Sequence, residues 1–89
     1  MAGIEVRGTG PGEFRVQVDE GGSSSEHHVI ASQEDLERLS SGYASAEEFI
    51  RACFEFLLAR EPKEQILPRF DVSVISRYFP EFEEQIRRK

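Results

Sequence analysis

The sequence has few of the residues that most often carry chemistry. Among 89 residues there are one cysteine, two histidines and no tryptophan. A single cysteine makes no internal disulfide, and a zinc site generally needs about four ligands at suitable spacing. The glycines of Gly8–Gly12 lack the Gly-Lys-Ser/Thr and the helix start of a phosphate-binding loop. These absences argue against metal, nucleotide and other cofactor sites.

Long apolar runs are also missing. No run approaches the roughly 20 residues that a membrane-spanning helix needs. The first residues lack the positive segment and apolar segment of a signal peptide. We therefore expect a cytoplasmic protein with no membrane partner.

Positive charge is scarce in the first two thirds of the chain. The net charge is −6, and residues 1–59 hold four arginines against eleven acids, whereas residues 60–89 hold seven bases against six acids. Nucleic-acid binders usually present a basic surface. The only basic run, Arg87-Arg88-Lys89, also suits the C-terminal end of a helix. We expect no nucleic-acid partner.

The length predicts one domain, residues 1–89, with a β-meander in residues 1–31 and a helical half in residues 32–89. Strict alternation over Glu13–Asp19 predicts a half-buried strand, and Ile4–Val6 and Glu26–Ala31 suggest two more. Gly8–Gly12 reads as a hairpin loop, and Gly21–Ser25 as a flexible linker. The fold class is α+β: a three-stranded antiparallel sheet followed by three to four helices packed on one face.

The helical half begins with two capping signals. Ser32 precedes a short helix that ends near Gly42, and Ser45-Ala-Glu-Glu48 forms a capping box for a helix from Ala46 to about Arg60. Pro62 ends that helix. Its apolar residues cover an arc of roughly 200°, about twice what a surface helix needs. This central helix should therefore contact the sheet on one side and other helices, or a second subunit, on the other.

Prolines divide the rest of the chain. Residues 63–67, between Pro62 and Pro68, should form a short helical turn. Asp71 is a plausible N-cap for a last helical region, whose apolar residues are spaced 3, 4, 3 and 4 apart: Val72, Ile75, Phe79, Phe82 and Ile86. Pro80 should divide this region into two pieces at Phe79. A strand over residues 72–74 is an alternative, although Ile75 breaks its alternation.

Two strings give the chain a distinctive signature. They are FEFLLAREPKEQIL over residues 54–67 and RFDVSVISRYFPEF over residues 69–82, and His28-Val29 adds to them. From His27 onward, in these strings, the chain resembles a group of short bacterial proteins of unassigned function. The resemblance implies a bacterial cytosolic protein and adds no activity, ligand or catalytic residue.

Three residues are candidates for chemistry. His27 and His28 are adjacent, so on a strand their side chains point to opposite faces. Cys53 lies on the apolar arc of the central helix, where a free cysteine behaves as a small hydrophobe. We assign no catalytic, cofactor or metal residue, and a Cys–His pair is the alternative.

The candidate interaction surface comprises Arg60, Glu61, Lys63 and Tyr78. The first three form a charged corner around Pro62, and functional residues often lie in such loops. Local structural roles are the alternative, and for Tyr78 we favour the edge of the core.

The function predicted first is a non-enzymatic protein–protein interaction module. It would bind a partner or a second copy through the helical half, whose apolar surface exceeds what a small sheet covers. A small enzyme or ligand-binding domain that uses His27, His28 or Cys53 is the second hypothesis.

Overall fold

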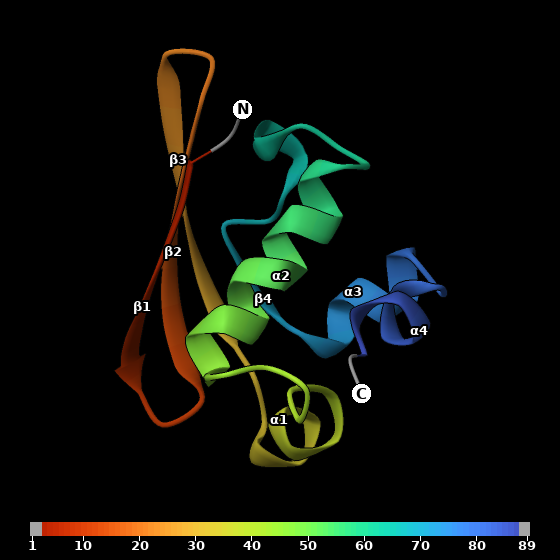
Figure 1. Ribbon diagram of the computed structural model, residues 1–89. Coiled ribbons are helices and arrows are strands. Elements are labelled where there is room, and N and C mark those ends of the chain that lie inside the picture. Colours follow the sequence, from red (N-terminus) through yellow and green to blue (C-terminus); the bar gives the residue numbers. More distant parts are fainter. Residues whose placement is uncertain (1–2, 88–89) are drawn as a thin grey trace.

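The computed structural model describes residues 3–87 and places one sheet against a layer of helices (Figure 1). In chain order the elements are β1 (Gly3–Gly10), β2 (Glu13–Glu20), β3 (Ser23–Ile30), α1 (Gln33–Leu39), α2 (Ala46–Leu58), the 3-10 helix η1 (Lys63–Gln65), β4 (Arg69–Asp71), α3 (Ser73–Tyr78) and α4 (Phe82–Ile86). The α+β class is as predicted. Arg88 and Lys89, part of the predicted basic end, lie outside the described residues.

The sheet differs from the prediction in one strand. It has four strands in the order β1-β2-β3-β4, and it is mixed, because β4 runs parallel to β3 while the first three strands form an antiparallel meander. In the parallel pair, Phe70 lies opposite Val29. A three-residue strand is too short to show a period in the sequence, so β4 was not predicted. The alternative strand over residues 72–74 is wrong, because α3 begins at Ser73.

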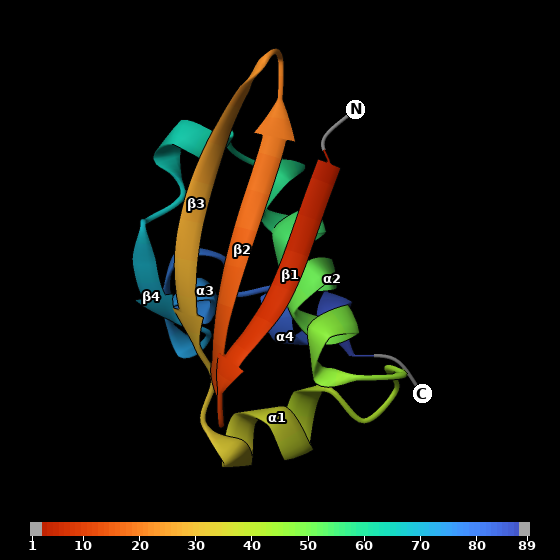
Figure 2. The same cartoon turned by 90° about the vertical axis from the view of Figure 1, so that its left-hand side faces the viewer.

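The two faces of the sheet have opposite character. On β2, Phe14, Val16 and Val18 are buried, whereas Arg15 and Gln17 are exposed. Figure 2 shows α2 behind the meander and no helix in front of it. The sheet therefore has an inner face, which packs on the helices, and an outer face, which is open to solvent.

Glycine turns connect the meander. Gly12 has φ +68°, and a Cβ there would collide with the Ala31 carbonyl oxygen, so this turn requires glycine. Gly21 and Gly22 also have positive φ and connect β2 to β3. The predicted linker over Gly21–Ser25 is wrong for its serines, because β3 begins at Ser23. A serine run gives no apolar alternation, which hid the start of β3, whereas the rest of this strand lies within the predicted Glu26–Ala31.

The predicted capping signals are confirmed. Ser32 Oγ accepts a hydrogen bond from the Asp35 amide at 3.1 Å, and Ser45 Oγ accepts one from the Glu48 amide at 3.2 Å. α2 begins at Ala46 as predicted and ends at Leu58, slightly earlier than predicted.

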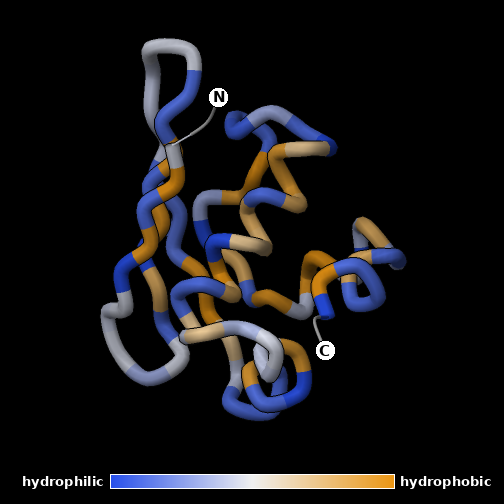
Figure 3. Tube along the Cα trace, viewed as in Figure 1, coloured by the Kyte–Doolittle hydropathy of each residue, from blue (hydrophilic) through white to orange (hydrophobic). Residues whose placement is uncertain are grey.

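α2 is the centre of the core, as its wide apolar arc predicted (Figure 3). The Phe54 ring lies 5.3 Å from the His27 ring and 5.9 Å from the Phe70 ring on the sheet side. On the other side, the Phe56 ring lies 5.1 Å from the ring of Phe82 in α4. Both layers therefore meet on this helix.

The C-terminal region consists of two helical pieces separated at Pro80, as predicted. α3 ends at Tyr78 and α4 begins at Phe82. Asp71 lies just before α3, where its Oδ1 accepts a hydrogen bond from the Ser73 amide at 2.9 Å. Both pieces bury apolar side chains, among them Ile75 and Phe82.

Candidate functional site

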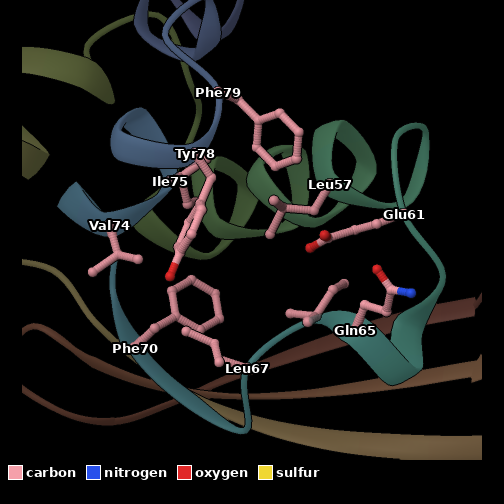
Figure 4. Close-up of a pocket in the computed structure, with 10 residues that line it drawn as sticks. Leu57, Glu61, Gln65, Leu67, Phe70, Val74, Ile75, Tyr78 and Phe79 are labelled. Atoms are coloured by element: carbon pink, nitrogen blue, oxygen red, sulfur yellow. The ribbon is translucent and has the colours of Figure 1, made fainter.

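A groove opens beside β4, between this strand and the helices (Figure 4). Its volume is about 370 Å³, within the range of roughly 300–1,000 Å³ that is usual for ligand pockets. The end of α2 contributes Leu57, and the following corner contributes Glu61. The other lining residues come from η1 through α3 and its end: Gln65, Ile66, Leu67, Phe70, Val74, Ile75, Tyr78 and Phe79.

The local sequence explains why these side chains converge. In β4 the alternation points Phe70 to the inner face, beside Val29, while Arg69 points outward. In α3 the spacing of 3 and 4 residues brings Ile75, Tyr78 and Phe79 to one side of the helix. A strand and a helix thus form two walls of the groove, and Leu57 of α2 forms part of the third.

The groove contains the most exposed large apolar side chains of the described chain. Leu67 is 45% exposed and Tyr78 is 68% exposed, and no other large hydrophobic residue in residues 3–87 is exposed. Both line the groove. Glu61 and Gln65 are its polar residues, and Figure 4 shows the Glu61 side chain extending toward Leu57. The groove is therefore a mostly apolar site with one carboxylate.

The structure divides the predicted interaction surface into two pairs. Glu61 and Tyr78 line the groove, so the two chain segments that carry them do meet at one site. Tyr78 was expected at the edge of the core, and that expectation is wrong, since most of its side chain is exposed.

Arg60 has contacts that hold α2 to α4. Its guanidinium carbon lies 3.6 Å from the centre of the Phe56 ring, and Nη1 donates to the Phe56 carbonyl at 3.1 Å. Nε donates to Glu81 at 3.3 Å and Nη2 donates to Gln85 at 3.1 Å. Arg60 therefore stabilises the packing of α2 against α4, and it does not line the groove.

Lys63 is buried in η1, although lysine is among the residues least often buried. Its Nζ donates a hydrogen bond to Glu64, and this bond lowers the pKa of the Glu64 carboxyl. Lys63 precedes two residues that line the groove, Gln65 and Ile66, but does not line it itself.

His27 supports the groove from within the sheet. Its side chain is buried, and Nδ1 lies 2.9 Å from the Leu67 carbonyl oxygen, which can only accept. Nδ1 therefore carries the proton, and Nε2 accepts from Ser25 Oγ at 2.8 Å when the ring is neutral. His27 thus fixes the backbone at Leu67, a role that sequence reasoning missed. The available signal was a histidine two residues before Val29, on the face of the strand that alternation turns toward the core.

The other two chemical candidates lie elsewhere. His28 is on the outer face, where Nε2 is 3.7 Å from Glu13 Oε1 and, within residues 3–87, has no hydrogen-bond partner. Cys53 is buried in α2, and burial raises the pKa of its thiol, so the thiol is protonated rather than a thiolate. His27, His28 and Cys53 share no hydrogen bond in the described part of the chain and do not line the groove.

The outer face carries a row of basic residues across the sheet. Arg7, Arg15, His28 and Arg69 are direct cross-strand neighbours on β1 to β4. Arg7 lies 3.6 Å from Glu5, and Arg15 lies 3.8 Å from Glu26. Arg69 forms no ion pair with any residue from 3 to 87. Arg69, at the β4 end of this row, is therefore a positive charge beside the groove with no ion-pair partner in the described chain.

Residues 3–87 contain no cluster of three or more metal-ligating side chains. No helix within this range is long and apolar enough to cross a membrane.

Comparison with protein-family models, curated proteins and solved structures finds no match.

Proposed function

We propose that the protein is a non-enzymatic interaction module whose groove receives an extended segment of a partner protein. The observation that carries this proposal is the concentration of exposed apolar surface in one place. Leu67 and Tyr78, the two exposed large apolar residues of the described chain, line the same groove. Contiguous exposed apolar surface usually marks a binding site.

The backbone of β4 supports an extended partner. The Pro68 carbonyl accepts from the His28 amide at 2.8 Å, and the Val72 amide donates to the Ile30 carbonyl at 2.8 Å. Backbone groups alternate along a strand, so those of Arg69 and Asp71 point away from β3, toward the open edge. A partner segment that pairs with this edge would complete a fifth strand, as in other cases of strand addition.

The charges beside the edge define the chemistry of the partner. A residue opposite Arg69 extends the basic row on the outer face, where opposite charge is favoured and like charge is disfavoured. A residue opposite Phe70 points into the groove, among apolar side chains. The preferred segment therefore has an acidic residue next to a large apolar residue.

A selection from random peptides of about twelve residues tests this proposal. Peptides selected on the parent protein should share an acidic residue beside a large apolar one. Tyr78→Ser and Leu67→Ser should weaken their binding by about tenfold or more, because hot-spot contacts lie in such apolar sites. Arg77→Ser is the matched control, since Arg77 is the exposed neighbour of Tyr78 and does not line the groove.

A second variant tests the charge rule. Arg69→Glu should change the selected residue from acidic to basic while the apolar residue remains. The proposal fails if selection yields no related peptides, or if the selected peptides bind Tyr78→Ser as tightly as the parent.

The enzyme or ligand-binding alternative has no comparable observation in its favour. Both ring nitrogens of His27 are engaged, and Cys53 is a buried, protonated thiol. A bacterial, cytoplasmic location remains part of the proposal. A free cysteine, which survives best in a reducing compartment, supports it.

A further inference from the structure

The other edge of the sheet, β1, is long and unpaired. β1 has eight residues, and its only strand neighbour among residues 3–87 is β2 (Figure 2). Val6 is only half-buried at this edge, although Val16, its cross-strand neighbour, is fully buried. Unpaired edges readily pair with another strand unless the sequence opposes it.

The charges of β1 are complementary to themselves in one antiparallel register. If two copies of β1 pair about a two-fold axis at Val6, Glu5 of each copy lies opposite Arg7 of the other. A register centred on Glu5 places glutamate opposite glutamate, and one centred on Arg7 places arginine opposite arginine. Like charges directly opposite each other destabilise a sheet, whereas opposite charges stabilise it. Charge therefore selects the register centred on Val6.

We propose that two copies of the chain associate through antiparallel β1–β1 pairing centred on Val6, which forms a continuous eight-stranded sheet. This contact is separate from the groove, which lies beside β4 at the opposite edge. It has closed two-fold symmetry, the commonest form among soluble oligomers.

The environment of β1 fits a second copy. Glu5 and Arg7 are largely exposed, at 70% and 74% of their side chains, and within residues 3–87 their only ion pair is with each other, at 3.6 Å. Association exchanges the one pair within each copy for two equivalent pairs between the copies, and it brings the two Val6 side chains together on the inner face. An edge contact of this kind is small, so the dimer should be weak and should weaken further as salt is added.

Charge reversal tests the register. At about 100 µM, a range suited to a small interface, sedimentation equilibrium should show dimer for the parent. Glu5→Arg alone and Arg7→Glu alone should each weaken self-association by about tenfold or more, because each places like charges opposite. An equimolar mixture of these two variants should form the mixed dimer, and the double variant E5R/R7E should dimerise like the parent.

Matched controls separate the register from net charge. Glu26→Arg on β3 and Arg77→Glu on α3 make the same charge changes at exposed positions away from this edge, and they should leave association unchanged. Circular dichroism checks that each variant is folded. If one is not, Glu5→Lys replaces Glu5→Arg, and Arg7→Asp replaces Arg7→Glu. The proposal is overturned if the parent remains monomeric at about 1 mM, or if the parent dimerises and neither single reversal weakens it.

Discussion

Phe54 is one of the fully buried side chains of the core, so it should contribute strongly to the free energy of unfolding. Its side chain is fully buried and lies between the His27 and Phe70 rings. Phe54→Ala should therefore lower the free energy of unfolding by about 3–5 kcal/mol, the range for a large-to-small change in a core. Glu55→Ala, on the exposed side of α2, is the control and should change it by less than about 0.5 kcal/mol. A chemical melt in which the two variants behave alike would contradict this role.

The positions of the three candidate metal ligands lead us to expect weak zinc binding. His27 uses both ring nitrogens, Cys53 is a buried protonated thiol, and His28 lies on the opposite face of the sheet. Calorimetric titration should show no zinc affinity tighter than about micromolar, since a tight site needs about four converging ligands. Stoichiometric nanomolar binding that is lost in His27→Ala would show that the assignment of these residues is mistaken.

Residue roles could be predicted where burial follows from periodicity. The helical spacing of Phe49 to Leu57 correctly predicted the buried arc of α2. It could not predict that Lys63 is buried, because charged residues are expected in solvent. Tyr78 lies outside the apolar stripe of Val72 to Ile86, and its ring, expected at the edge of the core, is exposed.

Two helices far apart in the sequence are connected by one charged cluster. Arg38 of α1 donates to both oxygens of Glu83 in α4, at 2.6 and 3.2 Å, and to Asp35 at 3.0 Å. The hydrogen bonds from Arg38 lower the pKa of the Glu83 carboxyl. A carboxyl whose pKa is lower in the folded state stabilises the fold above its ordinary pKa and loses that effect as the pH falls through the lowered value.

This cluster predicts how stability depends on pH. Arg38→Gln should lower the midpoint of thermal unfolding near neutral pH by a small amount, because the pair is partly exposed. The difference from the parent should shrink below the ordinary glutamate pKa and vanish once Glu83 is protonated. Glu34→Gln is a control, since Glu34 is an exposed acid of α1 that forms no ion pair within residues 3–87. A difference that stays constant down to about pH 2 would mean that Arg38 acts by packing alone.

Element predictions succeeded where local signals exist. The caps of α1 and α2 and the break at Pro80 are local, and all three were predicted. β4 depends on pairing with β3, a long-range contact that no local pattern records. The groove could not be predicted for the same reason, because this pairing is what brings Phe70 and Leu67 beside α3.

At the scale of the whole molecule, the sheet has two open edges with different proposed partners. The groove lies beside β4, and the self-complementary strand is β1, with β2 and β3 between them. Three inter-strand spacings separate the edges by about 14 Å. No ion pair within residues 3–87 joins β1 to β4. The two contacts should therefore form independently.

This independence gives the last prediction. A peptide selected for the groove should bind Glu5→Arg, in which the β1 contact is disrupted, with an affinity within about twofold of that for the parent. Equal affinity means no coupling free energy between the sites, and by linkage the peptide should then leave the dimerisation constant unchanged. Fluorescence anisotropy with a labelled peptide measures the first quantity, and sedimentation with and without saturating peptide measures the second. A shift of about tenfold in either would show that the edges communicate, and the rigid inner face built on α2 would be the element through which they do so.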